Sequence, residues 1–130
     1  MPELPEVQTV ADYIKPDLIG KNILKIEPLW KKVLHNFNPK DLNGKHRIQN
    51  VSRRAKFIII ELDNIILAIH LRMTGKLYLI KEKKLPKHAT AIIYLENSNN
   101  LIFEDTRKFG RIYIYKDLTE INKTHGPEPL

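Results

Sequence analysis

The sequence predicts a mainly β fold: a β-sandwich or flattened barrel of about eight strands, with flanking helices that include one at the N-terminus. Two observations predict it. From residue 46 onward, short β-branched segments recur between turn-forming residues such as Asp63-Asn64. Near the start, Val7, Ala11, Ile14 and Leu18 instead follow the three- and four-residue steps of a helix. With 130 residues, 42% of them apolar, the chain can bury one core, and we expect a single domain.

The elements follow in chain order from these patterns. The helix is expected to begin near Pro5 and to end or kink at Pro16, because proline lacks the amide hydrogen that a helix needs. Gly20 offers a turn into a strand at residues 22–29, and residues 38–44 are typical of a short helical turn. The later strands are expected at 46–52, 56–62, 65–71, 76–80, 89–95, 101–103 and 111–115, with a lysine-rich loop at 81–88 and a tight turn at 97–100.

Charge and composition restrict the classes of function. The net charge of +7 favours a polyanionic partner, with nucleic acid the first candidate and an anionic membrane surface the second. The sequence has no apolar run of membrane-spanning length and no signal-peptide pattern, so a cytoplasmic protein is expected. It has no cysteine, and its five histidines are scattered, so neither a disulfide nor a metal site is expected.

Pro2 is a candidate nucleophile. If Met1 is removed, the new N-terminus is a secondary amine beside the carboxylate of Glu3. An α-amino group titrates near pH ~8, so a useful fraction is unprotonated at neutral pH. Its attack on a sugar C1′ or a carbonyl gives an iminium, which promotes later eliminations. The ordinary alternative is a proline without any catalytic role.

Three turns combine cations with apolar residues, at 53–56, 70–75 and 104–111. Exposed apolar side chains flanked by positive charge suit a protein that distorts DNA. The cations hold phosphates while the apolar side chains enter the base stack. Each residue also has an ordinary alternative: a core position for Met73, a cap on the sandwich for Phe109, a solvated strand-end lysine for Lys56, a core histidine for His70 and an ion pair with Asp105 for Arg107.

Together these segments resemble the formamidopyrimidine-DNA glycosylase family, bacterial base-excision repair enzymes related to endonuclease VIII. The matching segments are PELPEV at 2–7, RRAKF at 53–57, HLRMTG at 70–75, DTRKFG at 105–110 and GPEPL at 126–130. Their order and spacing agree across the chain from Pro2 onward. The leucine in PELPEV, with Met73, Arg107 and Phe109, resembles the formamidopyrimidine branch more than the endonuclease VIII branch.

The resemblance implies a function and a set of catalytic residues. Pro2 would attack C1′ of a flipped, oxidised purine nucleotide, such as 8-oxoguanine or a formamidopyrimidine, and expel the base. Glu3 would supply or relay protons at the sugar, and Glu6 would be a second carboxylate near the sugar ring. Lys56 would contact the DNA strand that carries the lesion. The iminium would then allow strand cleavage by β,δ-elimination.

The resemblance also implies a DNA-binding set. His70 and Arg72 would help to hold phosphates. Met73, Arg107 and Phe109 would fill the space that the flipped nucleotide leaves, with Arg107 hydrogen-bonded to the orphaned cytosine. The whole set is His70, Arg72, Met73, Arg107, Lys108 and Phe109. Lys108 stands where the family usually has a second arginine, and Thr106 where proline is common.

The resemblance further implies a domain organisation. Residues 1–130 would be an N-terminal catalytic domain that ends at a hinge, with the helix–two-turn–helix and zinc-finger domains absent from this chain. No cofactor is expected here, and zinc is expected only in the missing C-terminal part. The expected partner is damaged double-stranded DNA in a bacterial cytoplasm, near the nucleoid. Two alternatives stay open: a non-catalytic DNA-binding module, and a basic β-sandwich that binds RNA or an acidic protein.

Overall fold

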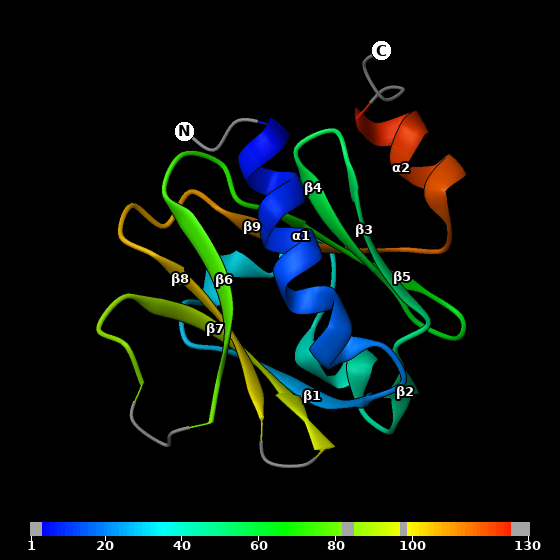
Figure 1. The fold of residues 1–130 in the computed structure, drawn as a ribbon, viewed down its shortest axis with the longest axis horizontal. Helices are drawn as coiled ribbons and strands as arrows, with labels where there is room; N and C mark the ends of the chain where they lie inside the picture. The colour runs from blue at the N-terminus through cyan, green and yellow to red at the C-terminus, as the bar shows by residue number, and fades with distance from the viewer. Residues whose placement is uncertain (1–3, 82–84, 97–98, 126–130) are drawn as a thin grey trace.

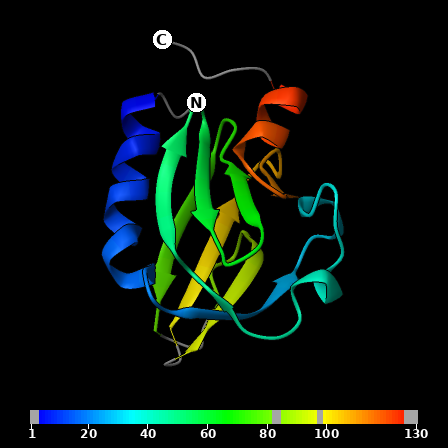
Figure 2. The same ribbon diagram turned by 90° about the vertical axis from the view of Figure 1, so that its right-hand side faces the viewer.

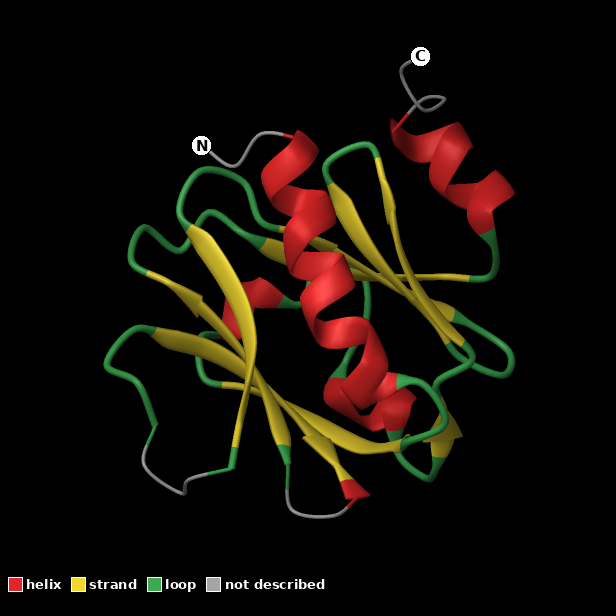
Figure 3. Ribbon diagram, viewed as in Figure 1, coloured by secondary structure: helices red, strands yellow, loops and turns green. Residues whose placement is uncertain are grey.

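Two antiparallel β-sheets form the framework of the protein in a computed structural model that describes residues 4–81, 85–96 and 99–125 (Figure 1 and Figure 3). One sheet has five strands in the order β2-β1-β7-β8-β6, and the other has four in the order β3-β4-β5-β9. The sheets do not close into a barrel, so the predicted sandwich with an N-terminal helix is the form confirmed. The elements are α1 (Leu4–Leu18), β1 (Asn22–Pro28), the 3₁₀ helices η1 (Lys31–Val33) and η2 (Pro39–Leu42), β2 (His46–Arg47), β3 (Asn50–Arg54), β4 (Phe57–Glu61), β5 (Ile66–His70), β6 (Gly75–Ile80), β7 (Ala89–Leu95), β8 (Asn100–Asp105), β9 (Arg111–Tyr115) and α2 (Leu118–His125).

Helix α1 closes the main core. Its apolar residues Val7, Ala11, Ile14 and Leu18 are all buried against residues from both sheets, as their spacing predicts. The helix continues through Pro16 and ends at Leu18, two residues beyond the expected end. The proline lies in the last turn on the exposed side, where water can replace the lost amide hydrogen bond.

Strands β4 and β5 of the four-stranded sheet are buried on both faces, which explains why their sequences are nearly continuously apolar. Ile58 and Ile60 of β4 face the main core, whereas Phe57 and Ile59 belong to a second apolar cluster on the opposite face. That second cluster includes Ile121 of α2. Figure 2 shows α1 and α2 on opposite sides of these strands. The sheet is therefore the central layer of this part of the fold.

The chain crosses from one sheet to the other inside the segment predicted as one strand at residues 46–52. The first part, β2, pairs with β1, and the second part, β3, pairs with β4. The amide of Ile48 donates to the carbonyl of Lys21 at 2.8 Å, and the next amide, of Gln49, donates to the carbonyl of Glu61 at 2.7 Å. The prediction of one strand is wrong because β-branched composition does not reveal this change of partner.

Most other predicted elements are confirmed within one or two residues. Strands β7 and β9 match their predicted bounds, and the turns at Gly20 and at Asp63-Asn64 are present. Helix α2 was not predicted. It packs through Ile121, and Asn122 accepts a hydrogen bond from Arg54 Nε at 3.0 Å. Part of the predicted turn at 97–100, part of the loop at 81–88 and the terminal GPEPL segment lie outside the described residues.

Two negative findings concern the described residues alone. None of the helices found there is both long enough and apolar enough to cross a membrane. Nor does any group of three or more His, Cys, Asp or Glu side chains in residues 4–81, 85–96 and 99–125 have an arrangement that could hold a metal ion.

Tyr78 and Tyr94 lie on the face of the five-stranded sheet that is turned away from the core. Tyr78 donates a hydrogen bond to Glu104, and Tyr94 donates one to Glu27 on the neighbouring strand. Burial, followed by the hydrogen bond to Glu104, raises the pKa of Tyr78 well above its usual value. The hydrogen bond to Glu27, followed by burial, raises the pKa of Tyr94.

The raised pKa values predict the behaviour of the fold at alkaline pH. The folded-state pKa lies above the unfolded value of about 10, so these phenols contribute their full stability below that pH. The contribution is lost as pH rises through the folded-state pKa. We expect Tyr78→Phe to flatten the decline of the unfolding free energy above pH ~10, measured by urea denaturation. A tyrosinate absorbance titration in which all five tyrosines ionise at the ordinary value would contradict this assignment.

Candidate functional site

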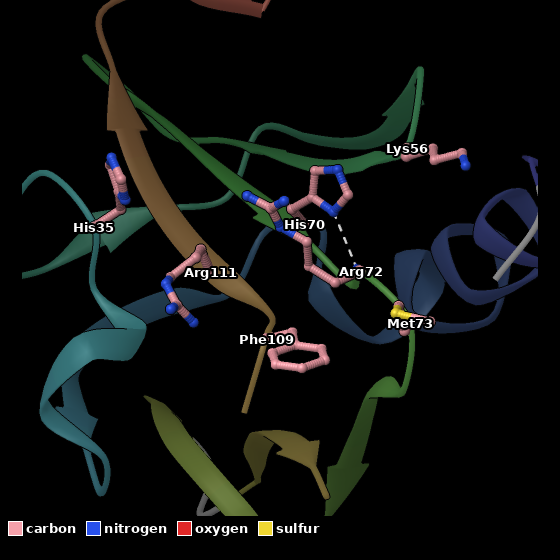
Figure 4. A pocket seen from close by; sticks show the side chains of 7 residues that line it. All are labelled: His35, Lys56, His70, Arg72, Met73, Phe109 and Arg111. Carbon is pink, nitrogen blue, oxygen red and sulfur yellow. Dashed lines mark hydrogen bonds between the residues drawn. The ribbon is translucent and has the colours of Figure 1, made fainter. Parts of the chain in front are cut away.

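An open cleft of about 590 Å³ lies where three turns meet the ends of β5 and β9 (Figure 4). Two exposed apolar side chains line it, Met73 and Phe109. Basic or imidazole side chains make up the rest of the lining: His35, Lys56, His70, Arg72 and Arg111. The structure thus brings five of the sequence-predicted site residues to one surface, namely Lys56, His70, Arg72, Met73 and Phe109.

Lys56 lies on the turn between β3 and β4 and is half-buried. The residue before it, Ala55, has φ of 52°, a left-handed conformation that is unfavourable for a residue with a Cβ atom. Arg53 holds this turn, because its Nη1 donates to the Ala55 carbonyl at 2.9 Å. The Nε of Arg53 also donates to Gln8 of α1 at 3.2 Å, so the helix fixes the turn that presents Lys56.

His70 is the last residue of β5, and Arg72 lies in the turn that follows it. Arg72 also has a left-handed backbone, with φ of 57°, and its amide donates to His70 Nδ1 at 3.0 Å. In a neutral imidazole this bond places the ring hydrogen on Nε2, which can donate to an anion. The His70 ring packs edge-on against Phe57 with centroids 4.8 Å apart, and Arg72 Nη2 lies 3.4 Å from the hydroxyl of Tyr113. Both cleft residues are therefore oriented by the layer of aromatic rings beneath them.

The turn at 106–110 is organised by the carboxylate of Asp105, which is only 1% exposed. Its Oδ1 accepts hydrogen bonds from the hydroxyl of Thr74 and from the amide of Arg107, the latter at 3.1 Å. Its Oδ2 accepts one from the amide of Gly110 at 2.7 Å. Asp105 thus ties the turn that carries Met73 to the turn that carries Phe109.

The ring of Phe103 lies against two glycines that flank these turns. A Cβ atom at Gly110 would lie 2.3 Å from Phe103 Cζ, and one at Gly75 would lie 2.5 Å from the Leu71 carbonyl oxygen and 2.9 Å from Phe103 Cε1. Real Cβ contacts are essentially never this short. Glycine is required at both positions by close approach.

The apolar residues of the cleft are exposed. Met73 is 44% exposed, which contradicts the alternative of a core methionine, and Phe109 is 45% exposed. The guanidinium carbon of Arg107 lies 5.3 Å from the centre of the Phe109 ring. Asp105 accepts from the amide of Arg107, and no ion pair joins their side chains among the described contacts.

The other predicted residues lie away from the cleft or outside the described chain. Lys108 is directed towards Trp30, with its Nζ 5.9 Å from the centre of the indole ring. Glu6, in the first turn of α1, lines an adjoining pocket of about 350 Å³ that also contains Met73. Pro2 and Glu3 lie outside the described residues.

Sequence reasoning did not place His35, Arg111 or Asp105 among the site residues. The amide of His35 donates to the Ile112 carbonyl at 2.9 Å, and its ring lies 4.7 Å from that of Tyr113. A single histidine in a polar loop gives no sequence signal for this position. Arg111 belonged to a recognised basic run, and Asp105 to a recognised motif. The available signal for Asp105 was a carboxylate at the start of this basic stretch, with a glycine five residues later at position 110.

Replacement of Asp105 tests the link between the turns. Asp105→Asn replaces one accepting oxygen by an amide NH₂ group, which then faces a hydrogen-bond donor of Thr74, Arg107 or Gly110 instead of accepting from it. We expect the unfolding free energy to fall by about 1–3 kcal/mol, measured by urea denaturation. Thr74→Ser keeps the hydroxyl donor and serves as the matched control. Unchanged stability in Asp105→Asn would show that the carboxylate does not hold the turns.

Comparisons with known proteins agree with this geometry. Residues 1–112 match the family described as the formamidopyrimidine-DNA glycosylase N-terminal domain. The formamidopyrimidine-DNA glycosylase of Protochlamydia amoebophila is 43% identical over a 137-residue alignment that covers all of this chain and 49% of that protein. The one from Herpetosiphon aurantiacus is 37% identical, covering all of this chain and 50% of that protein. The chain spans about half the length of the curated relatives it matches.

Solved structures of similar fold come from Lactococcus lactis. An Fpg variant in complex with Fapy-dG-containing DNA has a TM-score of 0.86 and 32% identity, over 95% of this chain and 46% of that one. Fpg with DNA that contains an abasic site has a TM-score of 0.85 and 31% identity, over 94% and 47%. The fold, the cleft motifs and the match over residues 1–112 lead to one assignment. The chain belongs to the formamidopyrimidine-DNA glycosylase family, to which it is related through the N-terminal domain.

Proposed function

We propose that this chain is the catalytic, DNA-binding domain of a base-excision repair enzyme for oxidised purines. It removes 8-oxoguanine and formamidopyrimidines from damaged double-stranded DNA and cleaves the resulting abasic site. The relatives are named as glycosylases of this kind, and the neighbouring structures hold DNA with Fapy-dG or an abasic site. The boundary at a hinge, a zinc finger elsewhere in the whole protein and a cytoplasmic location stay predictions.

The observation that carries this proposal is the composition of the cleft. Met73 and Phe109 are both nearly half exposed, and cations or imidazoles form the rest of the lining. Basic side chains neutralise phosphates, and exposed apolar side chains occupy the space that a flipped nucleotide leaves. An enzyme for small apolar molecules would bury such side chains in an enclosed pocket. This arrangement instead suits distorted DNA.

The proposed chemistry begins at Pro2. Its nitrogen forms a bond to C1′ while the bond from C1′ to the damaged base breaks, and the base leaves with a proton. The C1′–O4′ bond of the sugar ring then breaks, O4′ takes up a proton and the nitrogen loses its own proton, so that an iminium forms. The iminium draws electrons from the C2′–H bond, so successive β and δ eliminations release the phosphates. Glu3 relays protons at the sugar. Glu6, which lines the same pocket as Met73, is a second carboxylate near the sugar. The step requires loss of Met1, because an acylated proline nitrogen cannot attack.

Borohydride trapping tests this chemistry directly. The chain lacking Met1, checked by mass, should form a reducible adduct with an abasic-site duplex. The same chain with Met1 retained is the matched control, because it keeps the same side chains, and it should form none. Equal trapping by both would assign the adduct to another amine, a lysine or the Met1 α-amine, and overturn the role of Pro2. Binding of the duplex without any trapping would favour the non-catalytic DNA-binding module.

Salt dependence tests the phosphate contacts. Lys56→Gln and Arg72→Gln should each reduce the slope of log affinity against log salt by about 0.9, one counterion per lost contact. Lys87→Gln is the control, since Lys87 is exposed outside the cleft and loses the same charge. Fluorescence anisotropy of a labelled duplex measures all three. Equal slopes for the cleft variants and the unaltered chain would remove these residues from the DNA interface.

A further inference from the structure

The segment at residues 30–36 is fixed to both sheets. The amide of Trp30 donates to the carbonyl of Thr90 in β7 at 3.1 Å. At the other end, the side chain of Asn36 pairs with the backbone of Ile114 in β9. Its Nδ2 donates to the Ile114 carbonyl, and its Oδ1 accepts from the Ile114 amide, both at 2.8 Å. These bonds fix the backbone of the segment along the edge of β9, and the Trp30 ring packs, partly buried, against the main core.

Arg111 connects this ring to the turn that carries Phe109. Its guanidinium carbon lies 5.0 Å from the centre of the Trp30 ring, within the range of a cation–π interaction. Its Nη1 donates to the carbonyls of Lys108 and Gly110, each at 2.9 Å. The guanidinium therefore lies over a partly buried ring while it holds two carbonyls of the turn.

The turn needs such support. Lys108 has φ of 58°, a left-handed conformation that is unfavourable for a residue with a Cβ atom. The side chain next to it, Phe109, is 45% exposed and has little packing of its own to fix it. The carboxylate of Asp105 fixes the amides of Arg107 and Gly110, and Arg111 adds hydrogen bonds to the carbonyls of Lys108 and Gly110. The added bonds reduce the conformational entropy that the middle of the turn would lose on binding.

We propose that Trp30 and Arg111 form a brace that holds the 106–110 turn in its DNA-binding conformation before DNA arrives. Trp30 and Arg111 are positioning residues in this proposal, which rests on the proposed DNA-binding function. The brace fixes the backbone that positions the side chains of Phe109 and Lys108 for DNA. Its loss is expected to lower the affinity for an abasic-site duplex about fivefold, the value of a cation–π contact of about 1 kcal/mol.

Trp30 is the one tryptophan in the sequence, so its fluorescence reports on the brace in the unaltered protein. Binding of an abasic-site duplex should change Trp30 emission, because phosphates near Lys108 alter the charges over the indole ring. The change should follow the same binding curve as the anisotropy of the labelled duplex. Anisotropy that shows binding while Trp30 emission stays constant would show that no phosphate approaches Lys108, and would overturn the part of the proposal in which the brace places Lys108 on DNA.

A double-mutant cycle at constant charge provides the decisive test. Trp30→Leu, Arg111→Lys and the double variant all keep the net charge of +7, so a loss of affinity does not come from lost charge. Lysine cannot stack flat and donate to both carbonyls as arginine does. Each single variant should weaken binding about fivefold, and the double variant should be no weaker than either single one. Trp30→Phe keeps a ring and should restore much of the affinity.

The outcomes separate the proposal from its alternatives. Losses that multiply in the double variant, or Kd values equal to that of the unaltered chain despite a lower melting temperature, assign Trp30 a structural role and overturn the brace. If Trp30→Leu does not fold, Arg111→Lys and Trp30→Phe still decide between these results. Failure of the unaltered chain to bind any duplex by anisotropy overturns the proposed function and the brace together.

Discussion

The buried carboxylate of Asp105 is the interaction on which the cleft depends. A buried negative charge is unfavourable unless donors surround it, and here a hydroxyl and two backbone amides supply them. These donors belong to the turn before β6 and the turn after β8, which lie at the same end of this antiparallel pair. Meeting the requirement of the charge therefore fixes the two turns relative to each other. The ring of Phe103 below leaves room only for glycine at positions 75 and 110. The cleft is therefore a consequence of a buried charge and a buried ring.

The backbone around the cleft is held in unfavourable conformations. Within the described chain, the non-glycine residues with positive φ are Ala55, Arg72 and Lys108, one in each of the three turns. A neighbouring hydrogen bond holds each of them, from Arg53 to the Ala55 carbonyl, from the Arg72 amide to His70, and from the Lys108 amide to the Asp105 carbonyl at 3.3 Å. Strain of this kind persists only where the surroundings enforce it. The turns are thus preorganised at a cost that the rest of the fold offsets.

The sequence predicts the local patterns well and the long-range ones poorly. Apolar runs predict the strands because a local pattern marks each case: alternating apolar residues indicate a strand with one buried face, and a short continuous run indicates a strand buried on both faces. The crossing at Ile48 and Gln49 is not predictable in this way, since the two amides bond to segments far away in sequence. The same holds for His35, which reaches the cleft because its segment docks on β9. The motifs nevertheless bring Lys56, Met73 and Phe109 to one surface, as the resemblance implies.

The aromatic rings of Phe57 and Tyr113, which lie beneath the cleft, affect both the stability of the four-stranded sheet and the attraction of the cleft for phosphate. Tyr113 is almost fully buried in the cluster that packs α2, yet its hydroxyl lies beside Arg72 and its ring contacts that of His35. Phe57 extends this layer beneath His70. Because aromatic rings exclude water from one side of the cations, a phosphate there experiences a stronger attraction than it would in bulk water. The apolar cluster that stabilises the four-stranded sheet therefore also strengthens the field that its surface presents.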